Sequence, residues 1–174
     1  ENGVHIGLLP IRKENQADST ATLERIRKNG WDCYEVIEDP EYLFLGSGHP
    51  LALTGEITPQ MLAQVPLGTY SHVNDDNWLL FGHYFSGEAG FRCHSKDAIL
   101  QYVAQNRCAA IFPRFTSQYE YFVSQGAVQP VMVHGLDFGH ATFLLVHQSG
   151  KSLLREEQSV VCALKRYFKD CTCK

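Results

Sequence analysis

The sequence predicts an α/β fold built from mixed, mostly parallel β-sheets. Three observations point to this class. Short apolar runs typical of strands alternate with amphipathic stretches typical of helices, the segment 91–114 carries the signals of a complete strand–helix–strand unit, and the chain closes on a long amphipathic stretch. Because strands joined through a helix are usually parallel members of one sheet, this alternation favours helices layered on mostly parallel strands.

The strand–helix–strand unit has the most regular signals in the chain. Ser95 can accept N–H groups of a first helical turn, and Asn106 tolerates the left-handed conformation common at helix ends. The expected elements are, in order, a strand at 90–94, a cap at Ser95, a helix at 96–105, a turn at Asn106, and a strand at 108–112 that Pro113 ends. The second strand is apolar enough to be buried on both faces, and we expect it to run parallel to the first.

Before this unit, prolines divide the chain into short elements, since proline lacks a backbone N–H and fixes φ. The expected elements are a strand at 4–9 ended by Pro10, a loop at 12–18, a helix that Asp18 or Ser19 caps and Asn29-Gly30 closes, strands at 31–36 and 41–46 around a turn at Asp39-Pro40, a helix from Thr58-Pro59 to Pro66, and a strand at 67–70.

After the unit, capping and stop signals define the remaining elements. They are a helix at 116–125 with capping-box spacing between Ser117 and Glu120, a strand at 128–133, a loop at 134–138, a strand at 141–146, and a closing helix capped by Ser152 with Leu153, Val160, Leu164 and Phe168 on one face. An aromatic stripe in 74–85 predicts one more helix, whose rings we assign to the core.

The composition is that of an ordinary globular chain. Its 174 residues are 44% hydrophobic and 20% charged, enough for one domain or two small lobes with a real core. Fifteen Lys and Arg against 19 Asp and Glu give a net charge of −4, and no stretch concentrates positive charge, so the chain alone should bind nucleic acid poorly. Without a secretory signal or a run of about 18 apolar residues, we expect a cytoplasmic protein with no membrane contact.

Cysteines and histidines are numerous, but their spacing predicts no metal site and no cofactor. The six cysteines lack the close pairing of a zinc finger and are expected to be free thiols, with Cys171 and Cys173 in a frayed terminus rather than a redox or metal pair. None of the eight histidines shows the i, i+4 pairing with Glu that a zinc protease needs. Asp137 is the only acidic residue between His134 and His140.

Catalytic motifs are also missing, so we expect no enzyme. Cys93 and His94 are neighbours in an expected strand and would point to opposite faces, which prevents a hydrogen bond between them. The chain has no glycine-rich phosphate loop and no Gly-x-Ser-x-Gly elbow. A cysteine hydrolase that uses a distant histidine stays open as an alternative.

Several stretches carry, by their order and spacing, a resemblance to one family. The segment 43–67, LFLGSGHPLALTGEITPQMLAQVPL, resembles the hydrophobic strand, HPLA and following helix of the effector-sensing domain of LysR-type bacterial transcription regulators. The segments 95–114, 143–168 and 3–9 resemble that family's helix–strand unit, closing strand and helix, and first strand. His5 stands where the family usually has Asp, and Asn106-Arg107 replaces its flexible Gly.

The resemblance implies a two-lobed fold like the type 2 periplasmic binding proteins, with lobe one at 1–44 plus 140–174 and lobe two at 45–139, joined by two crossing strands. Relatives have a further strand–helix–strand portion and a helix-turn-helix domain before the first strand, so lobe one is expected to be truncated at its N-terminus. The implied partners are a small-molecule effector between the lobes, a second copy in a homodimer or tetramer, DNA through the absent helix-turn-helix domain, and RNA polymerase.

The resemblance also implies effector-binding residues. These are Pro10 and Ile11 from lobe one and Tyr70, Ser71, His72, His94 and Ser95 from lobe two. Ser95 at a helix start beside Ser71-His72 favours a small anion, whereas Tyr70 equally allows an aromatic acid. Both a capping role and a ligand contact stay open for Ser95. A solute-binding protein of the same fold is the alternative to a regulator.

Overall fold

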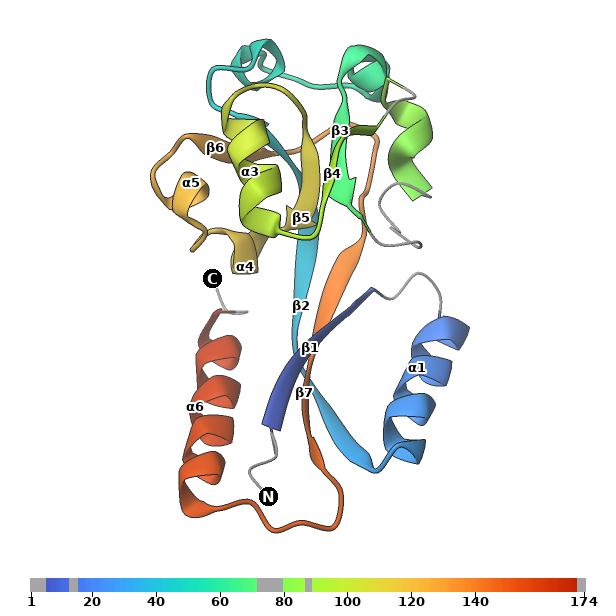
Figure 1. Ribbon diagram of the computed structural model, residues 1–174, viewed down its shortest axis with the longest axis vertical. Coiled ribbons are helices and arrows are strands. Elements are labelled where there is room, and N and C mark those ends of the chain that lie inside the picture. The colour runs from blue at the N-terminus through green and yellow to red at the C-terminus, as the bar shows by residue number, and fades with distance from the viewer. Residues whose placement is uncertain (1–5, 13–15, 72–79, 87–88, 172–174) are drawn as a thin grey trace. The chain divides into compact units, whose positions relative to one another are not determined.

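The structure is a computed structural model that describes residues 6–12, 16–71, 80–86 and 89–171 (Figure 1). The chain divides into two compact units, Glu1–Asp39 with Gly139–Lys174 (unit 1) and Pro40–Phe138 (unit 2). The lobe boundaries expected from the sequence, at 44/45 and 139/140, stay a prediction. Within the described ranges, no helix has both the length and the hydrophobicity needed to cross a membrane.

Unit 1 is a small sheet with two helices. Strand β1 (Ile6–Arg12) pairs antiparallel with β7 (His140–Gln148), and β7 lies beside β2 (Trp31–Gly46). Helix α1 (Gln16–Lys28) ends as predicted at Gly30, whose φ of 79° is left-handed. It begins earlier than predicted, so Asp18 and Ser19 lie inside the helix instead of capping it.

Helix α6 (Arg155–Cys171) closes the chain and buries Val161 and Phe168. Val160, which was predicted to share one face with Phe168, is 51% exposed, and its neighbour Val161 is buried instead. The predicted cap at Ser152 is also wrong, because the helix starts at Arg155 and the Leu154 N–H donates to Glu157 Oε2 at 2.7 Å. An acidic side chain at this end also complements the helix dipole.

Two predicted proline breaks are absent. Pro10 lies inside β1 opposite Phe143, which an edge strand tolerates because half of its N–H groups need no partner. The turn predicted at Asp39-Pro40 is wrong as well, since β2 runs through it as one strand of 16 residues. The ladder from β2 to β5 begins at Glu41, so Pro40 has no bond to donate there.

Unit 2 is built on a sheet in which β2 pairs on its two edges with β5 (Ala110–Pro113) and β6 (Val128–Val131). Strand β3 (Leu67–Tyr70) pairs with β4 (Ala89–Cys93) and meets the β5 segment through a bridge from Leu67 to Ala109. Side chains alternate between two cores: Leu43 and Ile111 enter one, and Phe44 and Phe112 enter the other. Helix α3 (Lys96–Ala104) covers the second core (Figure 1).

The expectation of mostly parallel strands needs correction. The ladders β1–β7, β2–β5 and β2–β6 are antiparallel, while β3–β4 and the bridge from Leu67 to Ala109 are parallel. The prediction considered only strands linked through helices, whereas the long strand β2 pairs with strands that return to it from later in the chain. Strands β4 and β5 are parallel as predicted, with β3 between them.

The other elements divide into confirmed and corrected ones. Helix α3 with its Ser95 cap and Asn106 turn (φ 59°) is confirmed, as is β3. The helix predicted from Thr58 exists as the 3-10 segment η2 (Pro59–Gln64). The prediction of a single helix at 116–125 is wrong. Two short helices, α4 (Arg114–Ser117) and α5 (Tyr121–Ser124), lie there instead, and Glu120 between them is extended. Part of the predicted helix at 74–85 lies outside the described residues; its end is η3 (Gly82–Tyr84).

The His49-Pro50 motif begins another 3-10 segment, η1 (Pro50–Leu53). The Leu51 N–H donates to His49 Nδ1 at 3.2 Å, so the imidazole acts as the cap and needs an unprotonated Nδ1. Burial lowers the pKa of His49, which favours this neutral form. The HPLA sequence therefore has a local structural role.

Replacing Gly68 should destabilise unit 2. A Cβ there would lie 2.8 Å from Cys108 Sγ and 3.1 Å from Ile99 Cγ2, so Gly68→Ala should lower the unfolding free energy by ~1–3 kcal/mol in urea titrations. Gly55→Ala is the matched control, because no atom lies within 4 Å of its added Cβ. Adding Cys108→Ala to Gly68→Ala should recover part of the lost stability. Equal stability of Gly68→Ala and Gly55→Ala would contradict the close packing around Gly68.

Cys108 should be unreactive while the protein is folded. Burial, and secondarily Cys93, raises the pKa of Cys108 to about 12 from an ordinary 9.0. Mass spectrometry after iodoacetamide treatment at neutral pH should find the exposed Cys162 modified and Cys108 intact. Because the folded chain keeps this proton and the unfolded chain releases it, stability should fall between pH 9 and pH 12 more in wild type than in Cys108→Ala. Equal losses of stability in wild type and Cys108→Ala would contradict the raised pKa of Cys108.

Candidate functional site

The parallel pairing of β3 with β4 brings two distant chain segments to one edge of the unit 2 sheet. Tyr70 stands opposite Cys93, and the Ser71 N–H donates to the Cys93 carbonyl at 2.9 Å. Both strands end here, so Ser71 and the pair His94-Ser95 follow them at the same carboxyl edge. Ligands of open α/β sheets bind outside this kind of edge.

Ser95 is a helix cap with an exposed hydroxyl. Its Oγ accepts from the Ala98 N–H at a long 3.4 Å, and its own N–H donates to Cys93 Sγ at 3.3 Å. The Cys93 thiol in turn lies 3.0 Å from the Ser95 carbonyl. A hydroxyl that accepts one hydrogen bond still has an O–H to donate. The structural role of Ser95 is therefore present, and it leaves room for a ligand contact.

Two side chains of the edge, Tyr70 and Cys93, lie on the same face of the sheet. Tyr70 and Cys93 pack against the core under α3, and the Tyr70 ring meets Phe112 edge-on with centroids 6.0 Å apart. His94 is exposed and follows Cys93 directly.

The sequence reasoning missed two charged groups close to this edge. Lys96 opens α3 and is paired with Glu120, its Nζ 3.1 Å from Oε1, while the same Nζ lies 5.2 Å from the centre of the Phe112 ring. Arg92 stands opposite Thr69 in the β3–β4 ladder and is exposed. Strand periodicity could have indicated Arg92, which shares a face with position 94, but nothing local predicts the pairing of Lys96 with a residue 24 positions away.

One buried hydroxyl was also missed. Thr69 is 3% exposed, and in the described part of the chain its Oγ1 makes no hydrogen bond. It lies next to Tyr70 at the end of β3. Burying a hydroxyl without a partner costs free energy, so Thr69 is an anomaly beside the candidate site.

The seven predicted effector residues are only partly brought together. Tyr70, Ser71, His94 and Ser95 share the edge described above. Pro10 and Ile11 lie in β1 of unit 1, and His72 lies outside the described residues. An effector contact by any of the seven stays a prediction.

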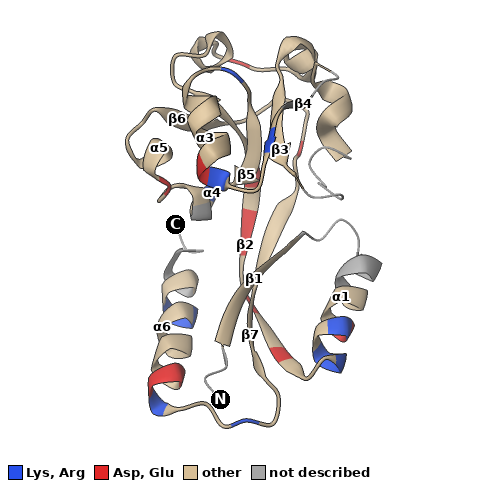
Figure 2. Ribbon diagram, viewed as in Figure 1, with Lys and Arg blue, Asp and Glu red and all other residues tan. Residues whose placement is uncertain are grey.

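Metal and nucleic-acid chemistry find no support in the described residues. No three His, Cys, Asp or Glu side chains there gather as metal ligands, and Cys33, Cys93, Cys108 and Cys162 are free thiols. Over the same part of the chain, basic and acidic positions are interspersed along the helices and strands (Figure 2).

Solved structures of regulatory domains have similar folds. The CcmR regulatory domain from Synechocystis, in complex with 2-PG, has a TM-score of 0.62 at 14% identity, and the alignment covers 93% of this chain and 73% of that one. The reduced OxyR regulatory domain from Pseudomonas aeruginosa gives 0.62 at 12% identity, covering 97% and 73%. The regulatory domain of MetR, a LysR family regulator from N. meningitidis, gives 0.55 at 17% identity, covering 97% and 71%.

No curated protein matches the sequence. A family model does: the LysR substrate binding domain matches residues 7–169, nearly the whole chain. The two units of mixed α/β structure agree with this assignment. The chain therefore belongs to the LysR substrate binding domain family, the ligand-sensing regulatory domains of LysR-type transcription regulators, and has their two-lobed fold, like that of type 2 periplasmic binding proteins.

Proposed function

We propose that this domain senses a small anionic effector at the carboxyl edge of β3 and β4. The observation that carries the proposal is the hydrogen bond from the Ser71 N–H to the Cys93 carbonyl, which aligns Ser71 with His94 and Ser95. Pro10, Ile11, Tyr70 and His72 complete the proposed set of contacts. The complex of the CcmR regulatory domain with 2-PG supports ligand binding by this fold.

The start of α3 offers donors to an anion. The N–H groups of Lys96 and Asp97 open the helix and have no carbonyl partner within it, and the helix dipole places partial positive charge at this end. The Ser95 hydroxyl and the His94 imidazole add side-chain donors. The Asp97 carboxylate works against an anion, so hydrogen bonding rather than net charge must supply the affinity.

The effector would act by favouring one of two states of the regulator. A ligand shifts such an equilibrium only by its difference in affinity for the two states. We propose that this shift passes through a homodimer or tetramer to a helix-turn-helix domain, with RNA polymerase as a further partner, in the cytoplasm. Regulatory domains of this family are generally not enzymes, and we propose the same for this chain.

A thermal-shift screen of small carboxylates, phosphate esters and aromatic acids should identify the effector. Ligand at about 100 times its Kd should add about 2.7 kcal/mol of stability. With the strongest ligand, His94→Ala should weaken binding about tenfold, because a hydrogen bond to a charged group contributes ~1.5–3 kcal/mol. His134→Ala, which removes another exposed histidine, should bind like wild type.

Ser95→Asp separates the capping role from ligand contact. Asp caps a helix as well as Ser does, so stability should hold, while its charge repels an anionic effector and lowers affinity. Asp97→Asn should tighten the same ligand. Unchanged affinity in Ser95→Asp and His94→Ala together would refute the site, and turnover of the ligand that disappears in Cys93→Ser would refute the sensor.

A further inference from the structure

One ion pair ties the start of α3 to the residue at which α5 begins. The Lys96 Nζ lies 3.1 Å from Glu120 Oε1, and the two side chains are only 22% and 29% exposed. Salt and solvent therefore screen this pair less than they screen a pair on the open surface. Helix α5 lies beside α3 in the fold (Figure 1). The pair links the helix that opens at the candidate effector edge to its neighbour.

The Lys96 ammonium stands at the carboxyl edge of the unit 2 sheet. Its Nζ lies 5.2 Å from the centre of the Phe112 ring, and this ring meets the Tyr70 ring edge-on at 6.0 Å. Tyr70 ends β3 opposite Cys93, whose thiol accepts from the Ser95 N–H at 3.3 Å. These contacts form a closed path from Lys96 back to Ser95, its neighbour in the chain. The ammonium and Ser95 therefore lie at the same strand ends.

Glu120 is held by its backbone, while its carboxylate faces Lys96. Its N–H donates to the Ser117 carbonyl at 3.1 Å, and its carbonyl accepts from the Ser124 N–H at 2.8 Å. An acidic side chain at a helix start can bond the first N–H groups of that helix. The Glu120 side chain makes no such bond to the described residues of α5. Its carboxylate therefore serves α3 instead of its own helix.

A buried hydroxyl in the same turn lacks a partner. Ser117 is 0% exposed, and among the described residues its Oγ makes no hydrogen bond. Burying a hydroxyl in this state costs free energy. Ser117 and Glu120 have the spacing of a capping box, in which the two side chains belong to one turn. The Ser117 hydroxyl is thus a donor that the Glu120 carboxylate would meet on leaving Lys96.

We propose that Glu120 is an internal competitor of the anionic effector for Lys96. In the unbound protein Lys96 pairs with Glu120. A bound anion takes the ammonium as its counter-ion, and the released carboxylate accepts the Ser117 hydroxyl. This inference rests on the proposed function, and it names the positive charge that favours an anion beside Asp97. A neutral ligand gains nothing from the ammonium, so the exchange selects ligands by charge.

The exchange also gives ligand binding a structural consequence. Because Glu120 precedes α5 directly, its release from Lys96 removes an ion pair that links α3 to the start of α5. Occupancy of the effector edge is thereby communicated to a helix outside that edge.

Titrations with inorganic phosphate, hydrocinnamate and the neutral phenethyl alcohol test the exchange, with the backbone amide shifts of His94 and Ser95 as the measure of binding. Lys96→Gln keeps the backbone N–H and should weaken binding of both anions about tenfold, because hydrogen bonds to charged partners are roughly twice as strong as neutral ones. Lys96→Arg should bind them nearly as wild type does. Glu120→Gln should tighten both anions about threefold, because it removes the competitor. Binding of the alcohol should be the same in all four proteins.

The double variant Lys96→Gln/Glu120→Gln separates competition from repulsion through space. A competitor acts only through Lys96, so the double variant should bind anions as weakly as Lys96→Gln does. Repulsion by Glu120 alone would make the double variant bind more tightly than Lys96→Gln. In wild type, the carboxyl carbon resonance of Glu120 should also shift as the anion binds, and in Lys96→Gln it should not.

Arg107→Gln is the matched control, with melting temperatures measured in parallel for all variants. Arg107 also lies over an aromatic ring, 5.4 Å from the centre of Tyr102, and follows α3 at its other end, so its loss should leave anion binding unchanged. Anions that shift Ser95 equally in wild type and Lys96→Gln would overturn the exchange and leave the effector edge intact. If no anion shifts His94 or Ser95, the proposed function fails and this inference fails with it.

Discussion

The parallel ladder between β3 and β4 is the constraint on which the candidate site depends. It fixes Tyr70 opposite Cys93 and places the ends of both strands at one edge. The ladder can pack only because Gly68 has no side chain, since a Cβ there would lie 2.8 Å from Cys108 Sγ and 3.1 Å from Ile99 Cγ2. The close approach of β3 to α3 and β5 thus places the start of α3, with Ser95, beside the end of β3.

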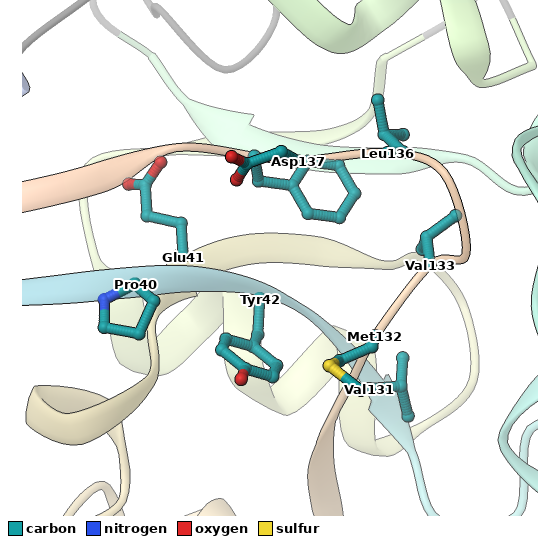
Figure 3. A pocket seen from close by; sticks show the side chains of 9 residues that line it. Pro40, Glu41, Tyr42, Val131, Met132, Val133, Leu136 and Asp137 are labelled. Atoms are coloured by element: carbon teal, nitrogen blue, oxygen red, sulfur yellow. The ribbon is translucent and has the colours of Figure 1, made fainter.

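Strand β2 is the second organising element. Its side chains alternate between two cores, so one strand supplies Leu43 and Leu45 to one face and Phe44 to the other. The β6 ladder on β2 ends at Leu43, and the residues of β2 before it, Pro40, Glu41 and Tyr42, help to line a pocket (Figure 3). The candidate effector edge and this pocket therefore lie on the same sheet, at the ends of different strands.

The sequence predicts an element correctly where the residues that determine it lie close together in the chain. The Ser95 cap, the left-handed Asn106 and the η2 start at Thr58-Pro59 all rest on backbone chemistry within a few residues. Pro10 and Pro40 were wrongly predicted to interrupt strands. Whether a strand needs the N–H of a given residue depends on which strands pair with it, and local sequence does not show this. The break at Glu120 accompanies its pairing with Lys96, and the pocket at Glu41 and Asp137 joins segments almost 100 residues apart, so neither could be predicted from periodicity.

The most direct test of the account is to follow the backbone amide chemical shifts of the isotope-labelled chain during titration with the strongest anionic ligand. The largest changes should fall on Ser71, His94, Ser95 and Lys96, with Asp137 unaffected, because the ligand is held at the β3–β4 edge by donors at the start of α3. Saturable binding that leaves the amides of Ser71 and Ser95 unchanged would contradict the central claim.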